Sequence, residues 1–267
     1  MGAQGPTAKE ILLDAAEQVL GEKSLETIEP STSIEIALPD ADAPPSAPFK
    51  EPPTCWTQRS IPRALRNGPA SLMVGLDFEC PRWRPGCVVR WAAWRAGFDS
   101  QDDADFAAEQ LYMASEAWNA ADVGVRFKWV PLAQDATFVL CHGGNKSTAL
   151  AEAFFPNAND LNYMFVYTAA FGAAWKDNMW KVFTHELGHV LGLRHEFAMS
   201  TDPNWREGGA EQLGPRNEFS VMTYRLEPPE IQQSDIDSTR LFYQLRKDQN
   251  GKPPKVGMTY VKDYIPN

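Results

Sequence analysis

The chain has 267 residues, of which 43% are hydrophobic and nine are tryptophan, so it can bury a sizeable core and is not a disordered chain. Its formal net charge of −10 at pH 7 argues against nucleic acid as the main partner. No apolar run approaches the roughly 20 residues that a membrane-spanning helix needs. We therefore expect a folded protein with neither a nucleic-acid partner nor a membrane span.

The first 53 residues carry most of the negative charge. They contain ten acidic and three basic side chains, which leaves a balance of −3 for the rest of the chain. Residues 7–20 have apolar side chains at helical spacing, and Thr7 and Glu10 are placed as an N-terminal capping box. Seven prolines between residues 30 and 53 disfavour regular structure there. Over 1–53 we predict an acidic helix followed by a proline-rich linker.

The remainder of the chain alternates between strand and helix patterns. Residues 54–82 form a connecting or pro-like segment, with a short strand expected within 71–78. We predict strands at 88–94, 125–129, 137–141 and 163–167, an edge strand at 147–155, and helices at 103–121, 178–191 and 234–246. Ser234 is the expected cap of the last helix. The tail over 247–267 is predicted to be loop.

The most informative segment is HELGHVLGLRHE, which runs from His185 to Glu196 and holds three of the four histidines. Positions i and i+4 share a helix face, so His185 and His189 can present two imidazoles to one ion. Gly192 can adopt the positive φ that ends a helix, which lets His195 approach from another direction. Three imidazoles leave one position of a tetrahedral zinc site open, as in a catalytic site. We therefore predict one catalytic Zn²⁺.

Glu186 is the candidate general base of this site. It follows the first histidine, so on a helix it cannot point in the same direction. It is therefore a poor ligand and a good candidate to hold a metal-bound water. An isolated HExxH pattern also occurs by chance in surface or core helices, but the added glycine and third histidine favour metal binding. The sequence predicts a zinc hydrolase.

The pattern H-E-x-x-H-x-x-G-x-x-H-E resembles that of the metzincin zinc peptidases. A glutamate directly after the third histidine is typical of their astacin subgroup. Downstream, the SVMTY segment over 220–224 is similar to the astacin Met-turn, in which a methionine lies beneath the zinc and a tyrosine follows two residues later. The resemblance covers residues 83–246.

This resemblance implies an α+β fold of the zincin, or metzincin, type. We expect a mixed, twisted five-stranded sheet with an active-site helix, and a smaller irregular C-terminal subdomain that contains the Met-turn and a closing helix. The catalytic domain would then span 83–246, preceded by segments 1–53 and 54–82 and followed by the tail 247–267. An extended peptide would bind along the edge strand near 147–155.

The resemblance also assigns roles to the motif. His185, His189 and His195 would bind the zinc, and Glu186 would take a proton from the zinc-bound water as it attacks the peptide carbonyl. Tyr224 would be an additional, displaceable zinc ligand that can hydrogen-bond the developing oxyanion. Glu186 and Tyr224 are thus the predicted catalytic residues of a zinc endopeptidase.

Three further residues would support the site without catalysing the reaction. Met222 would pack beneath the zinc ligands, and Gly192 would turn the chain between them. In the resembled family the glutamate at the position of Glu196 is buried and pairs with the amino terminus of the processed enzyme. In an unprocessed chain, an arginine or lysine such as Arg194 would have to take the place of that amino terminus as its partner. The alternatives are ordinary core packing for Met222 and Tyr224, and a solvated side chain for Glu196.

Other residues leave open whether the chain is a latent precursor. Cys55, Asp77 and Cys80 precede the catalytic domain and could block zinc, although structural cysteines and a surface aspartate are the alternative. The four cysteines could form two disulfides or stay reduced. His142 is expected at a strand end, with a catalytic or second-metal role as the less favoured interpretation.

The expected partner is a peptide or protein substrate, and the expected state is a monomer. Two other functions stay open. One is a peptidase dedicated to one partner, with the proline-rich arm over 30–53 as its docking element. The other is a catalytically silent, zinc-containing binding protein. The resemblance implies secretion, but no secretory signal is visible, so a cytoplasmic location stays open.

Overall fold

The computed structural model describes residues 5–21, 25–31, 73–76, 78–95, 97–200, 207–224 and 228–266. Cys55, Asp77 and almost all of the proline-rich segment over 30–53 lie outside these ranges, so the expectations that concern them stay predictions. Within the described ranges, no helix has both the length and the apolar character that crossing a membrane requires.

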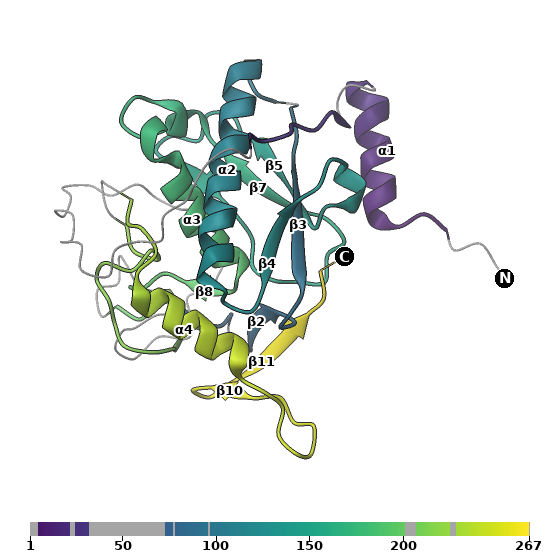
Figure 1. Ribbon diagram of the computed structural model, residues 1–267. Helices are drawn as coiled ribbons and strands as arrows, with labels where there is room; N and C mark the ends of the chain where they lie inside the picture. The colour runs from purple at the N-terminus through teal and green to yellow at the C-terminus, as the bar shows by residue number, and fades with distance from the viewer. Residues whose placement is uncertain are drawn as a thin grey trace.

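A five-stranded sheet forms the centre of the molecule (Figure 1). Its strands, in spatial order, are β4 (Arg126–Trp129), β3 (Val88–Ala93), β5 (Phe138–His142), β7 (Asn162–Val166) and β6 (Ala151–Glu152). The first four strands are parallel to their neighbours, and β6 is antiparallel to β7. The predicted mixed five-stranded sheet of an α+β protein is therefore confirmed.

The edge strand β6 is shorter than the sequence predicts. We expected it over 147–155, but only Ala151 and Glu152 pair with β7. One reason is that Ser147 has a φ of 54°, which interrupts an extended run. Among the described residues, the outer side of β6 pairs with no other strand of the sheet.

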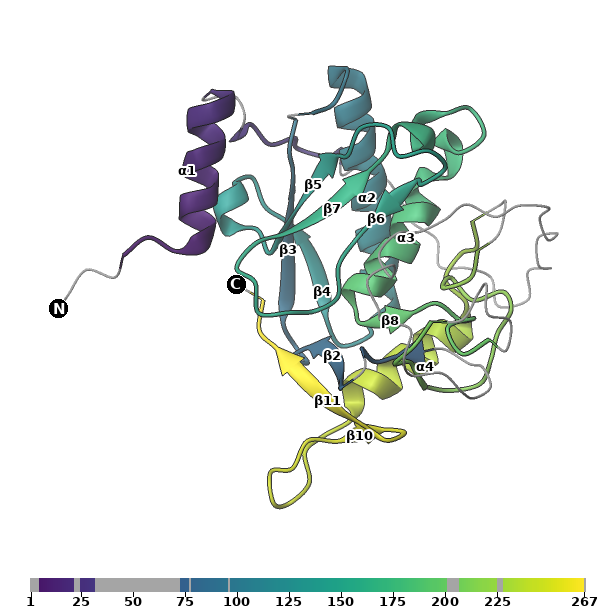
Figure 2. The ribbon, with the colours of Figure 1, turned by 180° about the vertical axis from the view of Figure 1, so that it is seen from behind.

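Helices cover both faces of the sheet (Figures 1 and 2). Helices α2 (Gln101–Ala121) and α3 (Met179–Val190) pack together on one face, whereas α1 (Ala8–Leu20) lies on the other. The indole N–H of Trp118 on α2 donates to the carbonyl oxygen of Thr184 on α3 at 2.9 Å. This buried hydrogen bond ties the two helices together at the level of the HExxH motif.

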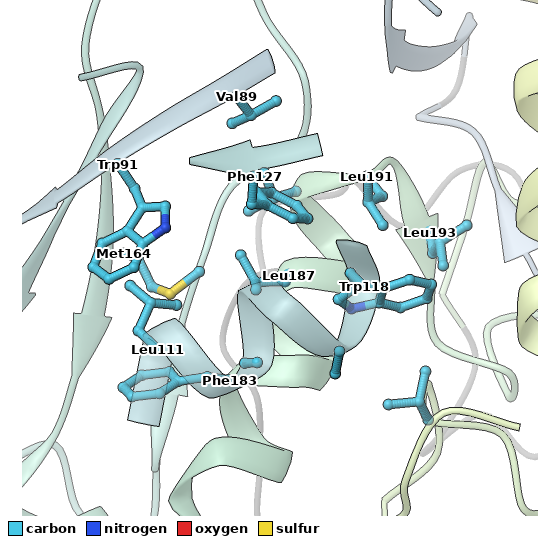
Figure 3. Packing of buried hydrophobic residues seen from close by; sticks show 14 of the residues in the cluster. Val89, Trp91, Leu111, Trp118, Phe127, Met164, Phe183, Leu187, Leu191 and Leu193 are labelled. Atoms are coloured by element: carbon cyan, nitrogen blue, oxygen red, sulfur yellow. The ribbon is translucent and has the colours of Figure 1, made fainter. Parts of the chain in front are cut away.

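The core between the sheet and these two helices is built from large apolar side chains (Figure 3). Trp91 on β3, Leu111 and Trp118 on α2, and Phe183 and Leu187 on α3 are all fully buried. Burying each such side chain stabilises the fold by about 1.5–3 kcal/mol. Because Phe183 and Leu187 hold one face of α3 in this core, the direction of its opposite face is fixed as well.

The N-terminal helix α1 begins as the sequence predicts. The Thr7 side chain accepts a hydrogen bond from the Glu10 backbone at 3.2 Å, and the Thr7 backbone donates to the Glu10 carboxylate at 2.7 Å. Leu13 is buried against the outer face of the sheet. Further along, the backbone N–H of Ile28 donates to the carbonyl of Ala93 at the end of β3 at 2.9 Å. The N-terminal segment therefore packs against the central sheet.

Two small three-stranded sheets lie below the main one (Figure 2). The first has the order β8 (Leu193–Arg194), β1 (Met73–Val74) and β9 (Glu211–Gln212), and the second has the order β10 (Lys255–Val256), β11 (Thr259–Tyr264) and β2 (Glu79–Trp83). Strands from outside the span 83–246 thus pair with strands inside it. The division of the chain into domains at residues 83 and 247 stays a prediction.

The prediction of loop over 247–267 is wrong, because this tail contains β10 and β11. β11 runs parallel to β2, and the buried Arg82 forms an ion pair with Asp263 at 2.7 Å. The hydroxyl of Tyr264 donates to the carboxylate of Glu79 at 2.5 Å. A six-residue strand whose partner lies about 180 residues earlier has no local pattern that distinguishes it from a polar loop.

Helix α4 (Gln233–Gln244) closes the lower part, but Ser234 does not cap it. Gln232 is the cap, and its backbone N–H donates to the carboxylate of Asp235 at 2.9 Å. The cap of this helix therefore lies two residues earlier than predicted. Short 3₁₀ helices span Ala133–Asp135, Thr168–Phe171 and Lys176–Asn178.

Candidate metal centre

Helix α3 and the turn after it bring the three motif histidines together. His185 and His189 lie one helical turn apart, with ring centroids separated by 4.9 Å. Gly192 then adopts a φ of 94°, as expected from its position at the helix end, and strand β8 follows. His195 comes directly after β8 and contacts both other rings. Among the described residues, these three side chains form the group that could hold a metal ion.

The ring nitrogens of the cluster point toward one another. Nε2 of His195 lies 3.2 Å from Nε2 of both His185 and His189. On the opposite side of each helical ring, Nδ1 lies 2.8 Å from a backbone carbonyl oxygen, that of Val221 for His185 and that of Leu193 for His189. A carbonyl can only accept, so Nδ1 carries the proton and Nε2 presents its lone pair to the centre.

This arrangement fits a tetrahedral ion such as Zn²⁺. Two nitrogens at roughly 2.0–2.1 Å from a tetrahedral zinc lie about 3.3 Å from each other, and the Nε2 separations are 3.2 Å. Burial lowers the pKa of His185 to about 3, and the nearby His195 contributes to the effect. Burial also holds the pKa of His189 well below its ordinary value. Both imidazoles are therefore in the neutral form that binds metals.

The third histidine is held differently, by a side chain that the sequence analysis missed. Nδ1 of His195 lies 2.6 Å from a carboxylate oxygen of Glu207, and the other oxygen of Glu207 lies 3.4 Å from the guanidinium of Arg194. No periodicity or motif marks Glu207, which lies in a loop. The one available signal is an acidic residue within a short stretch of the last histidine. Several acidic residues satisfy this condition, so it does not single out Glu207.

The turn over 220–224 packs under the cluster. It supplies the carbonyl of Val221 to His185, and the carbonyl of Met222 accepts a hydrogen bond from the backbone of Glu196 at 3.0 Å. Met222 is fully buried, and a Cβ added to Gly188 would lie only 2.4 Å from its sulfur. The glycine between the two helical histidines therefore leaves space for the methionine.

The turn is anchored from helix α4 by a residue that sequence analysis did not single out. The carboxylate of Asp235 is buried and accepts from the backbone N–H of Val221 at 2.8 Å, in addition to its bond at the helix cap. Burial raises the pKa of this carboxyl. Asp235 thus connects the start of α4 to the loop that orients His185.

Tyr224 ends the turn beside the cluster. Its ring centroid lies 4.6 Å from that of His195, 5.7 Å from that of His185 and 4.9 Å from that of Phe197. The side chain is half-buried. Glu186, by contrast, is buried on α3 with 1% of its surface exposed. Both predicted catalytic side chains therefore belong to elements that carry or contact the histidines.

Comparison with known families shows the family to which the chain belongs. The model of metallo-peptidase family M12 matches residues 96–234, just over half of the chain, and this span includes all three histidines. The chain belongs to metallo-peptidase family M12. The predicted metallopeptidase is thereby confirmed, and peptides are its substrate class.

Other comparisons are distant. No curated protein matches the chain in sequence. The solved structure titled "Structure of myroilysin" is 11% identical, covers 64% of this chain and 98% of its own, and has a TM-score of 0.46. The structure titled "GM1 bound form of the ECX AB5 holotoxin" is 15% identical, covers 64% of this chain and 88% of its own, and has a TM-score of 0.42.

Glu196 of this metallopeptidase is buried, so the alternative of a solvated side chain is wrong. One oxygen accepts from the backbone N–H of Asn217 at 2.5 Å, whereas Oε2 is buried without a hydrogen-bond partner among the described residues. Burial raises the pKa of Glu196 to about 7. Among the described residues Arg194 does not pair with it: Nη1 of Arg194 donates to the carbonyls of Gly75 and Gly208, and Nη2 lies 3.4 Å from Glu207.

The described cysteines of the metallopeptidase favour structural roles over a latency switch. Cys80, Cys87 and Cys141 are free, so the described cysteines form no disulfide with one another. Cys80 is buried on β2, does not belong to the metal-capable cluster, and burial raises its pKa to about 12. Only the thiolate is a good metal ligand, so a structural role is favoured for Cys80. Cys55 and Asp77 lie outside the described residues.

His142 also has a structural environment. Nδ1 lies 2.8 Å from the carbonyl oxygen of Gly97, and Nε2 lies 3.3 Å from the hydroxyl of Thr168. Its ring stacks on Phe98 with 5.5 Å between centroids. These contacts are those of a histidine that ends a strand, and they favour the structural interpretation over a second metal site.

Proposed function

We propose that this metallopeptidase is a zinc endopeptidase of the astacin-like metzincin type. The observation that carries the proposal is the convergence of three buried imidazoles, with Nε2 of His195 at 3.2 Å from Nε2 of His185 and of His189, a separation that suits a tetrahedral ion. The order of the residues around them adds the subtype: Glu196 follows the third histidine, and Met222 and Tyr224 lie in a turn against the cluster. We regard that turn as the Met-turn of the resembled family.

The zinc ion would be held by His185, His189 and His195. When bound, it would supply a Lewis acid that polarises the substrate carbonyl and makes water more acidic. Three histidine ligands would leave one coordination position for water or substrate.

Glu186 is the proposed general base. Its carboxylate would accept a proton from the attacking water while the water oxygen bonds to the peptide carbon. It would then give that proton to the leaving amine nitrogen as the carbon–nitrogen bond breaks. Glu186 is buried next to His185 on helix α3, and the packing of this helix in the core would help to position its carboxylate for the reaction.

The substrate is proposed to bind as an extended strand beside β6. The outer side of β6 is an available edge within the described sheet, and backbone hydrogen bonds there would hold a peptide of any sequence. The ring of Phe155, shortly after β6, lies 5.4 Å from that of His189. A peptide laid along this edge would therefore pass the metal cluster.

The proposal is tested with the purified full-length chain and a diverse peptide mixture, with and without chelator, followed by mass spectrometry of the products and of the protein's own N-terminus. We expect cleavage at internal peptide bonds that chelation abolishes and added Zn²⁺ restores. Cleavage that continues unchanged after the metal has been removed would refute a zinc peptidase. Zinc retained at one equivalent with no cleavage would instead identify a zinc-containing binding protein.

Tyr224 is proposed to donate a hydrogen bond to the oxyanion of the transition state. Tyr224→Phe is then expected to lower kcat by about 10²-fold with little change in KM, because the lost donor acts only where charge develops. The measurement is steady-state cleavage of a peptide found in the mixture. The matched control is Tyr163→Phe, since Tyr163 packs with α1 on the other face of the sheet. If both variants keep wild-type kcat, Tyr224 is only a packing residue.

A further inference from the structure

The third histidine differs from the other two in what holds it. His185 and His189 donate from Nδ1 to backbone carbonyls, which carry no net charge. His195 instead contacts the carboxylate of Glu207 at 2.6 Å. A carboxylate only accepts, so it requires the proton of His195 to stay on Nδ1 and leaves the Nε2 lone pair directed at the cluster.

Glu207 is itself held from behind by a buried arginine. Arg194 is fully buried, and one nitrogen of its guanidinium donates to the carbonyls of Gly75 at 2.6 Å and Gly208 at 2.7 Å. A second nitrogen, Nη2, lies 3.4 Å from a carboxylate oxygen of Glu207. Because Gly75 directly follows strand β1, the connection extends from the segment before the catalytic span, through Arg194 and Glu207, to the third histidine.

We propose that Glu207 is a positioning residue: it sets the tautomer and the ring orientation of the metal ligand His195. Arg194 holds the carboxylate of Glu207 in place. The inference rests on the proposed zinc site. Carboxylates that orient metal-binding histidines in this way change metal affinity by about 10- to 100-fold when they are replaced. The negative charge also favours a divalent cation bound on the far side of the ring.

The distances distinguish this role from that of a simple ion pair. Glu207 lies closer to His195, at 2.6 Å, than to Arg194, at 3.4 Å. Arg194 also donates to two backbone carbonyls, so the carboxylate of Glu207 is not the only group that stabilises its buried positive charge. The shorter contact is therefore the one directed at the metal ligand.

The test compares Zn²⁺ affinity of the full-length wild type with that of Glu207→Gln and Glu207→Ala, by competition with a chromophoric chelator. We expect Kd to rise about 10- to 100-fold in both variants. The visible absorption spectrum of the Co²⁺-loaded protein should change as well, because the geometry around the ion changes. Glu211→Gln is the matched control: Glu211 lies on β9, in the small sheet that also contains Arg194, and its carboxylate accepts from the hydroxyl of Thr259 at 2.7 Å. It should keep wild-type affinity.

The outcomes separate this inference from the proposed function. If the wild type binds no zinc, the proposed function fails whatever Glu207 does. If the wild type binds zinc and Glu207→Gln binds it equally tightly with an unchanged Co²⁺ spectrum, the positioning role is refuted. If Glu207→Gln and Glu207→Ala do not fold, Glu207→Asp is the variant to test, because it keeps the negative charge on a shorter side chain. A folded Asp variant with an altered Co²⁺ spectrum and weaker binding supports the inference, and one with wild-type values overturns it.

Discussion

Replacing Glu186 with glutamine is expected to lower kcat/KM for peptide cleavage by about 10²- to 10⁴-fold while zinc stays bound. Glutamine has nearly the same shape as glutamate but cannot accept the proton of the attacking water. Glu186 is 1% exposed on helix α3, and the isosteric change leaves the packing around His185 and His189 intact. The loss should therefore appear in kcat and not in metal content.

The measurement combines steady-state kinetics on one identified peptide with zinc content by elemental analysis. Glu109→Gln, the same change on the neighbouring helix α2, is the control and should keep wild-type kinetics. If Glu186→Gln turns over peptide as fast as the wild type, Glu186 is not the base. Loss of zinc together with activity would mean that the residue acts on the metal and not on the proton.

Replacing Gly192 with alanine is expected to destabilise the fold by about 2–5 kcal/mol. Gly192 has a φ of 94°, a conformation that costs an L-residue about 1–2 kcal/mol. In addition, a Cβ at this position would lie 2.2 Å from the carbonyl oxygen of Pro81, and forcing an extra carbon into packed surroundings costs about 1–3 kcal/mol more. Pro81 lies on β2, which is paired with β11, so it cannot easily move away.

The free energy of unfolding in urea measures this effect. Gly86→Ala is the matched control, because Gly86 has a φ of 84° but nothing lies within 4 Å of the added Cβ. It should lose only the conformational part, about 1–2 kcal/mol. If both variants lose the same free energy of unfolding, the close approach to Pro81 does not contribute to the destabilisation. We also expect Gly192→Ala to weaken zinc binding, because His195 follows this turn.

The central elements of the site could be predicted from local sequence because their chemistry is local. The spacing from His185 to His189 places two ligands on one helix face, and Gly192 marks the turn before the third. Sequence patterns located the ends of α2, α3 and the parallel strands to within two residues. Errors occurred where the signal was weak: the edge strand β6 was predicted too long, and the cap of α4 was placed at Ser234 instead of Gln232.

Amino-acid sequence by itself predicted the candidate metal ligands and the candidate base, and it identified the chain as a peptidase, because these depend on residues within one helix and one turn. Only the tertiary structure decided what holds the ligands in place. Glu207, Arg194 and Asp235 act through contacts whose partners lie in different loops and strands, and β11 finds β2 across the length of the chain. Such pairings arise from packing of the whole molecule, and no short-range pattern of residue types encodes them. For that reason, the sequence predicted which histidines converge, while the structure was needed to find the carboxylate that orients the third of them.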